Sequence, residues 1–545
     1  MKKLLALMMS AILMTSFAGC AGNSAKPAEE TTDTKQMPSK FDLRNADGKN
    51  YVTPVKSQRW GDCWTFAMAG AAETAYLYAN GLGVPAGETN DKVNFSEKYI
   101  AWYMFHGITK DDAAKGKVRS SQAGEGFDIS EAEKGNAMSA YFIGGPFVQS
   151  ANLFGSGFGP VDESTEIKGE LPYAYNDEAS VEWALPLNAE YRSVPAAAVF
   201  RDSRVLPCPA SFDAKGSYHL NEEGINAIKQ EVFQGHGVVL ALNAAHAGFN
   251  NKNRAVYDSS DEGPNHAVVV IGYDDDYPKE NFTRTKSDGT AVEGSTPPAN
   301  GALIIKNSWG KKTFDDDIDD GYFYISYYDH SLLSAMSYVF DNSGEKPAAL
   351  HYDQYDLMMT QWYGATEYKD ETKMANIFDA EEDAALCRIE YRTAAPGAEV
   401  AYEVYKGVEQ DNPSSGTLLE KGTCSHPNAG SHVVDLDGKY SLKKGERYAV
   451  VLTVKHGDSY IEVFPYATDF VEGMTVRGVI NKGESFLYTG GKWSDMTVAK
   501  DSLCERAKKQ CADNLAADKA LPPLSPEGKA FAVDNYPIKA ILQTD

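Results

Sequence analysis

A cysteine at the start of an alanine-rich stretch is the residue of this chain best suited to nucleophilic chemistry. Cys63 follows a loop that carries Gln58, and the residues after it favour a helix. At a helix N-terminus the unpaired N–H groups and the helix dipole favour an anion, so a cysteine there can ionise below the free-thiol pKa of about 8.5. The sequence therefore predicts a reactive thiolate at Cys63.

Two further polar residues stand beside short apolar runs far downstream. His266 precedes the run 267–271, and Asn307 follows the run 303–305. Such runs are typical of buried strands. A histidine that opens one strand and an asparagine that closes the next can converge on Cys63, which gives a nucleophile, a general base and a group that orients the base.

With these residues in this order, the chain resembles the papain-like cysteine peptidases, and within them the bacterial branch that carries a C-terminal lectin-like domain. Each motif alone is weak, and their joint occurrence in the family's order is specific. The motifs are Phe41-Asp42-Leu43-Arg44, Val52-Thr53-Pro54-Val55-Lys56, the Cys63 helix, Ser96-Glu97, the His266 strand, Asn307-Ser308-Trp309-Gly310 and Gly321-Tyr322-Phe323-Tyr324-Ile325-Ser326.

The resemblance implies a role for each of five residues. Cys63 is the nucleophile, and His266 takes the thiol proton and later protonates the leaving amine. Asn307 holds the imidazole without adding a charge, and Trp309 covers that contact. Gln58 and the backbone N–H of Cys63 bind the oxyanion, and one such donor is typically worth about 3 kcal/mol.

Some positions depart from the family pattern. Gln58 stands five residues before Cys63 where six is usual, so the intervening loop must turn more tightly. His266 lies farther from Cys63 than the usual ~130–150 residues, which predicts insertions, most of them within 165–225. Gly144 and Gly145 resemble the family's glycine pair, along which a substrate backbone can lie as an added strand. A plain turn is an equally good interpretation of that pair.

Each of these residues also has a structural interpretation. Taken alone, Cys63 could be a buried thiol, His266 a hydrogen-bonded core histidine and Asn307 a turn residue. The acidic run 315–320 has the oxygens that calcium prefers, but a solvated acidic loop explains it better. We therefore expect no metal and no cofactor.

The first nineteen residues predict an export signal. Lys2 and Lys3 precede an apolar run, and small residues lead to Cys20, which is the pattern of a lipoprotein signal peptide over 1–19. Cleavage there would leave a lipid on Cys20, so that residues 20–38 form a flexible tether to a membrane. The sequence thus predicts an exported lipoprotein, anchored at the membrane or cell surface.

Charge and cysteine content limit the partners. The formal charge of −25 argues against nucleic acid as a ligand. Five cysteines remain besides Cys20 and Cys63. Cys504 and Cys511 are the pair most readily bridged, although a helix would hold them two turns apart and reduced. Pairing of Cys387 with Cys424 is a weaker alternative.

The predicted fold class is α+β: a two-lobed, papain-like peptidase domain over 39–340, a linker over 341–349 and an all-β, lectin-like sandwich over 350–545. Predicted peptidase elements are helices at 96–103, 131–142 and 222–233 and strands at 238–242, 266–272, 303–307 and 322–327. Predicted sandwich strands are 387–393, 399–406, 432–437, 448–455, 460–466, 485–489 and 532–542, with a helical insertion over 502–519.

These features predict a surface cysteine endopeptidase that acts on protein or peptide substrates. A glycan or cell-wall ligand is the candidate partner of the sandwich. One alternative is a weak or inactive peptidase homologue that serves in adhesion or glycan binding, which the short Gln58 loop keeps open. Another is a peptidoglycan amidase that uses a similar dyad.

Overall fold

The computed structural model describes residues 37–544, except 115–117, 135–139, 166–191, 193, 214–215, 245–247, 261, 311–319, 345, 470 and 518–530. Its helices are α2 (Cys63–Ala79), α3 (Glu97–Phe105), α4 (Lys110–Ala114), α5 (Ser130–Lys134), α6 (Phe147–Gly155), α7 (Glu222–Phe233) and α8 (Lys500–Ala517). The signal peptide, Cys20 and most of the predicted tether lie outside the described residues.

The strands follow in two groups. Those of the first are β1 (Lys40–Asp42), β2 (Lys49–Asn50), β3 (Val84–Pro85), β4 (Gly126–Asp128), β5 (Phe200–Leu206), β6 (Ala210–Phe212), β7 (Tyr218–Leu220), β8 (Val238–Leu242), β9 (Phe249–Asn250), β10 (Ala255–Val256), β11 (His266–Asp274), β12 (Ala302–Lys306), β13 (Tyr322–Ser326) and β14 (Leu333–Phe340). Those of the second are β15 (Leu350–Asp353), β16 (Trp362–Tyr368), β17 (Lys373–Asp379), β18 (Ala384–Thr393), β19 (Ala398–Lys406), β20 (Thr417–His426), β21 (Gly430–Leu442), β22 (Arg447–His456), β23 (Ser459–Thr468), β24 (Thr475–Arg477), β25 (Ser485–Thr489), β26 (Lys492–Asp495), β27 (Phe531–Val533) and β28 (Ile538–Gln543).

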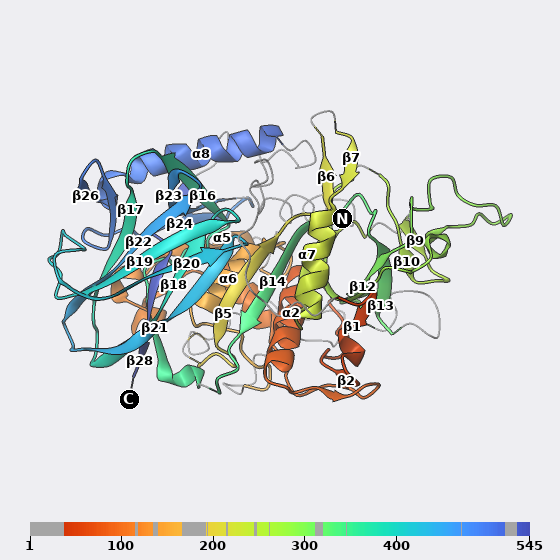
Figure 1. Cartoon of the computed structure of the whole chain (residues 1–545), viewed down its shortest axis with the longest axis horizontal. Coiled ribbons are helices and arrows are strands. Elements are labelled where there is room, and N and C mark those ends of the chain that lie inside the picture. Colours follow the sequence, from red (N-terminus) through yellow and green to blue (C-terminus); the bar gives the residue numbers. More distant parts are fainter. Residues whose placement is uncertain are drawn as a thin grey trace.

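Helix α2 runs through the middle of the first part of the chain (Figure 1). Its alanines favour a helix, and almost all of its side chains are buried, as expected of a helix that is apolar on every side. The helix ends at Ala79, and Gly81 beyond it has a φ of 64°, a left-handed conformation that glycine adopts without strain. Cys63, at the opposite end, is thereby fixed to a rigid element.

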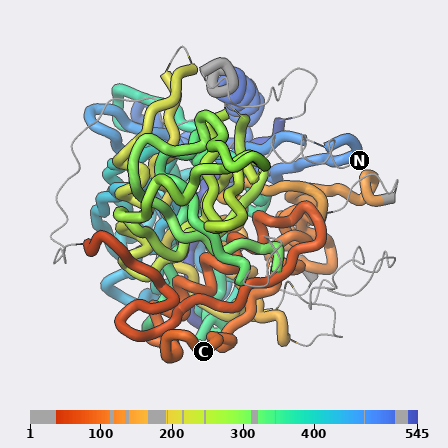
Figure 2. The backbone as a smooth tube through the Cα atoms, turned by 90° about the vertical axis from the view of Figure 1, so that its right-hand side faces the viewer, coloured from red at the N-terminus to blue at the C-terminus, as the bar shows by residue number. Residues whose placement is uncertain are grey.

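The strands beside α2 form the sheet that carries the other candidate residues. Strand β11 pairs with β8 on one side and with β12 on the other, in each case antiparallel. The N-terminal strand β1 pairs with the far end of β11, and Figure 2 shows this red segment beside the green strands. His266 at the start of β11 and Asn307 just after β12 therefore lie at the same edge of the sheet.

The second part of the chain is a β-sandwich, as predicted. Strands β15, β28, β18 and β21 form one layer. In the other layer β16, β23, β22, β17, β25 and β26 are neighbours in that order, and β19, β20 and β27 also belong to it. A separate hydrophobic core lies between the two layers. Helix α8 lies along the outside of this part (Figure 1).

One sheet passes through both parts of the chain. In the described residues it has 13 strands, and β21 of the sandwich adjoins β5 of the first part. The two strands pair at His432 and Asp202, whose side chains also bond, with 2.9 Å between His432 Nδ1 and Asp202 Oδ1. The sandwich therefore continues the sheet of the first part.

Two predicted elements differ from the structure. The helix predicted over 131–142 is described over Ser130–Lys134, residues 135–139 lie outside the described residues, and residues 140–142 form a turn. The strand predicted over 532–542 is two strands, β27 and β28, in different sheets. Pro537 between them has no N–H to donate to a ladder.

Candidate active site

Cys63 is the first residue of α2 and is nearly buried. Its exposed fraction is 1%. The backbone N–H of Ala267 lies close enough to the sulfur to lower the pKa of the thiol. Since Ala267 directly follows His266 in β11, the thiol lies against the start of that strand. The structure thus brings Cys63 to the edge of the sheet where His266 and Asn307 meet.

His266 is held in place on two sides. Its Nε2 lies 2.8 Å from Oδ1 of Asn307, and its ring centroid lies 4.5 Å from that of Trp309. The exposed fractions of His266 and Asn307 are 4% and 3%. The carboxamide oxygen can only accept, so Nε2 carries the proton and Nδ1 is left as the basic nitrogen. Trp309 packs against the ring of His266 beside this contact.

The charge states of Cys63 and His266 differ from the prediction of a preformed thiolate. Burial raises the pKa of Cys63 to about 12, and this exceeds the opposing effect of nearby backbone N–H groups. The carboxylate of Asp62, the residue before it, adds to the rise. Burial lowers the pKa of His266 to about 4. The prediction is therefore wrong for the ligand-free site, because desolvation outweighs the helix N-terminus and leaves a neutral thiol beside a neutral imidazole.

Gln58 is anchored beside the same edge. Its Oε1 accepts a hydrogen bond of 2.5 Å from Ser308 Oγ, and its backbone N–H donates to the Ser308 carbonyl. Its side-chain Nε2 donates to the carbonyl of Trp60 at 2.8 Å, within the shortened loop. These bonds fix the carboxamide and leave one of its two N–H groups for a ligand.

The glycine pair lies next to the cysteine helix. Gly144 and Gly145 are buried, and the indole N–H of Trp64 donates to the Ile143 carbonyl at 2.8 Å. A Cβ added at Gly145 would lie 2.8 Å from the ring of Trp64. Gly145 is therefore required for the packing of the residue that follows Cys63, whichever role the pair has toward a substrate.

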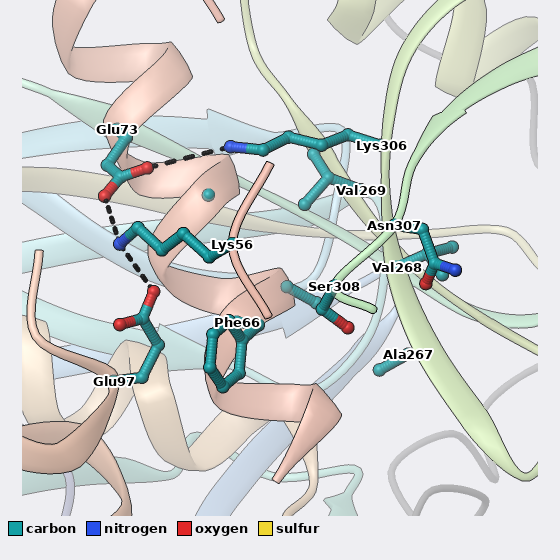
Figure 3. Close-up of a pocket in the computed structure, with 12 residues that line it drawn as sticks. Lys56, Phe66, Glu73, Glu97, Ala267, Val268, Val269, Lys306, Asn307 and Ser308 are labelled. Atoms are coloured by element: carbon teal, nitrogen blue, oxygen red, sulfur yellow. Dashed lines mark hydrogen bonds and ion pairs between the residues drawn. The ribbon is translucent and has the colours of Figure 1, made fainter. Parts of the chain in front are cut away.

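A cluster of buried charges lies along the cysteine helix, which contributes Glu73 to it (Figure 3). Lys56 Nζ bonds Glu73 at 3.0 Å and Glu97 at 2.6 Å. Lys306 Nζ bonds the hydroxyl of Thr53 at 2.7 Å and lies 3.9 Å from Glu73. The cluster joins α2, α3, the segment before Gln58 and the end of β12.

Burial governs the ionisation of these charges. It lowers the pKa of Lys306 to about 8 and raises that of Glu97, against the opposing charge of Lys56. Lys306 precedes Asn307, and Lys56 stands two residues before Gln58. The charge cluster therefore holds the segments that carry these two candidate residues. Lys56 and Glu97 lie within the family motifs, but the sequence alone assigned them no role. The signal for a buried charge cluster was Glu73, a glutamate within an otherwise apolar, alanine-rich run.

Comparison with protein families decides the class of this chain. Residues 164–340 match the model of the papain family cysteine protease, and residues 352–507 match that of the lectin like domain. The chain therefore carries a papain-family cysteine peptidase domain and a lectin-like domain. The peptidase match contains His266 and Asn307 and begins after Cys63.

Two solved structures share the fold along nearly the whole chain. The clostridial cysteine protease Cwp84 after propeptide cleavage is 20% identical, with 93% of this chain and 100% of that chain covered and a TM-score of 0.62. The cysteine protease and lectin-like domains of Cwp84, a surface layer associated protein of Clostridium difficile, are 20% identical, covering 97% of this chain and 94% of that chain at a TM-score of 0.61. No curated protein matches the chain. The predicted fold class is confirmed.

The remaining cysteines are all reduced in the described part of the chain. The bridge between Cys504 and Cys511 is wrong because both lie on α8, where seven residues span about 10 Å, beyond the reach of a disulfide. Cys387 and Cys424 form no disulfide either.

Two features are absent from the described residues. Among them, no group of three or more His, Cys, Asp or Glu side chains could hold a metal ion. Within the same ranges, no helix combines the length and the apolar character needed to cross a membrane.

Proposed function

We propose that the chain is an endopeptidase that cleaves peptide bonds through Cys63, with His266 as acid and base and Asn307 as the residue that orients the ring. One observation carries the proposal: His266 bonds Asn307 at 2.8 Å while the backbone N–H of the next residue, Ala267, lies near the sulfur of Cys63 and lowers its pKa. We take residues 39–340 as the peptidase domain, 341–349 as the linker and 350–545 as the lectin-like domain.

The neutral pair supports proton transfer during attack. The sulfur attacks the carbonyl carbon of the substrate as His266 Nδ1 takes the thiol proton, which forms a C–S bond and an oxyanion. The backbone N–H of Cys63 and the side chain of Gln58 stabilise that oxyanion. The imidazolium then gives its proton to the leaving amine, and the C–N bond breaks. His266 then deprotonates a water, which attacks the acyl carbon. The C–S bond breaks, the acid leaves, and the imidazolium returns its proton to the sulfur.

The surroundings of the dyad support a role in binding extended peptides. Gly144 and Gly145 have no side chains to obstruct a substrate backbone, and Trp309 excludes water from the bond between Asn307 and His266. Protein or peptide substrates are the expected partners. No cofactor or metal takes part in this mechanism.

Location and the second domain form a further part of the proposal. The signal-like sequence before Cys20 supports export and lipid attachment at that sulfur. The similarity in fold to a surface layer associated protein agrees with a position at the cell surface. The lectin-like domain supports a glycan or cell-wall ligand.

Active-site labelling tests the proposal. An epoxide thiol inhibitor should modify the full chain once, at Cys63, and abolish cleavage of casein and of a peptide library. Cys63→Ala should lose both labelling and cleavage, whereas Cys208→Ala, a matched change at a partly exposed cysteine, should keep both. A correctly folded wild type without labelling or cleavage would support the adhesion alternative, and cleavage of muropeptides alone would support the amidase.

A further inference from the structure

A closed ring of hydrogen bonds contacts the segment that precedes His266. Its members are Asn243, just after β8, Asp258, after β10, and Asp329 and Ser331, in the turn between β13 and β14. Asn243, Asp329 and Ser331 have exposed fractions of 0 to 1%. The ring therefore joins three segments that are far apart in sequence, and three of its four members are buried, while Asp258 is half-buried.

Every bond of the ring has a defined donor. Asn243 donates from its backbone N–H to Ser331 Oγ at 2.8 Å and from Nδ2 to Asp258 Oδ2 at 2.9 Å. Asp258 donates its backbone N–H to Asp329 Oδ2 at 2.7 Å. Ser331 donates from both Oγ and its backbone N–H to Asp329 Oδ1, at 2.5 and 2.9 Å. The carboxylate of Asp329 thus accepts three bonds and closes the ring.

The ring is connected to His266 through one carboxamide. Asn265 Nδ2 donates to Oδ1 of Asn243 at 2.8 Å, and Asn265 Oδ1 accepts from the backbone N–H of Ala244 at 2.9 Å. Because a backbone N–H can only donate, the amide of Asn265 has a single orientation. Asn243 then has a single orientation too, since its oxygen faces Asn265 and its nitrogen faces Asp258. Asn265 directly precedes His266 in the chain.

We propose that Asp329 is a positioning residue for the peptidase reaction. Its bonds to Ser331 and Asp258 hold Asn243, and Asn243 in turn holds Asn265 and so the position of His266. This inference rests on the proposed function. The ring contacts Asn265, the residue before His266. The residue after His266 is Ala267, whose backbone N–H lowers the pKa of Cys63. A shift of Asn265 would move the imidazole relative to both Asn307 and the thiol.

The cost of burying this carboxylate sets it apart from an ordinary turn residue. Burial raises the pKa of Asp329 to about 7, and the bonds from Ser331 and Asp258 oppose that rise. An isolated buried carboxylate is strongly unfavourable, so the three donors are what permit it. A bond network that defines one arrangement of three segments is suited to fixing a catalytic base, whose misplacement by about 1 Å can cost ~100-fold in rate.

Asp329→Asn tests the ring with almost no change in volume. In either orientation the new amide turns its NH₂ group toward a backbone N–H, of Asp258 or of Ser331, so one bond of the ring is lost. We expect kcat to fall about 10- to 100-fold with KM within about twofold. We also expect the acidic limb of kcat/KM to move to higher pH, because a displaced His266 would be better solvated. A purely structural role would move neither.

Two further variants keep the test decisive. Asn265→Ala should lower kcat to a similar extent, and the double variant with Asp329→Asn should lose little more than either single variant, because both act through the same contact. Asp353→Asn is the control, since Asp353 is also buried and bonds Tyr448 in the sandwich part. It should lower the melting temperature and leave kcat unchanged.

The outcomes separate the two proposals. If the wild type does not cleave peptides, the proposed function is wrong. If the wild type cleaves them while Asp329→Asn and Asn265→Ala keep wild-type kcat and pH profile, the inference is overturned. Should Asp329→Asn fail to fold, Asn265→Ala alone decides, because its half-buried side chain can be removed with little loss of packing.

Discussion

At the scale of single residues, burial has the largest effect on the chemistry of the site. A thiol at a helix N-terminus is usually acidic, yet burial and the neighbouring Asp62 raise the pKa of Cys63 to about 12. Burial also lowers the pKa of His266 to about 4. With these shifts both groups are neutral over most of the pH range in the ligand-free site, so the imidazole is unprotonated.

The low pKa of His266 leads to a prediction about acid pH. The base is lost only when the imidazole is protonated, so activity should persist as pH falls and should decline near pH 4, well below the ordinary histidine value of about 6.5. The measurement is kcat/KM against pH with a substrate that does not titrate in this range. An acidic limb at 6.5 or above would show that His266 is solvated or already paired with a thiolate.

At the scale of elements, the buried charges hold the cysteine helix against the rest of the peptidase. Glu73 on α2 receives bonds from Lys56 and Thr53 and lies near Lys306 at the end of β12. These are the segments that carry Cys63, Gln58 and Asn307. Removing one member leaves a buried charge without its partner, which is far more costly than the pair itself is stabilising.

Glu73→Gln should therefore destabilise the chain markedly. It leaves Lys56 and Lys306 with less compensating charge, and breaking a buried pair costs about 3–5 kcal/mol. The expected loss is measured by chemical denaturation. Glu505→Gln on α8 is the control, because its pair with Lys508 is exposed and should contribute little to stability. Equal losses in the two variants would contradict a bracing role for the cluster.

At the scale of the whole molecule, the two domains share a sheet and a buried acidic contact. Strand β21 continues the peptidase sheet at β5. Glu125 of the peptidase part and Asp534 of the sandwich are fully buried, and each carboxyl acts on the pKa of the other, which favours a proton held between them. Burial raises the pKa of both carboxyls.

This contact predicts that stability falls as pH rises. The folded chain keeps a proton that the unfolded chain releases above pH ~4, so stability declines with pH from about 4 up to the raised pKa of the pair. Melting temperatures between pH 5 and 9 measure the decline. Glu125→Gln, a neutral mimic of the protonated acid, should flatten it. A slope equal to that of the wild type would mean that the pair does not hold the proton.

Short-range patterns were sufficient to predict much of the fold and the family. Helix α7 and strands β8 and β25 have the predicted bounds, because periodicity and turn residues are local signals. The order of Cys63, His266 and Asn307 and the residues around them predicted the family that the comparison found.

Only the tertiary structure decided the rest. The direction of the thiol pKa depends on how completely other segments cover Cys63, and the ring at Asp329 joins residues up to 88 positions apart. The sheet that passes through both domains rests on one pairing between β5 and β21. Burial and long-range hydrogen bonds arise when distant segments meet, so a local pattern of residue types contains no signal for them.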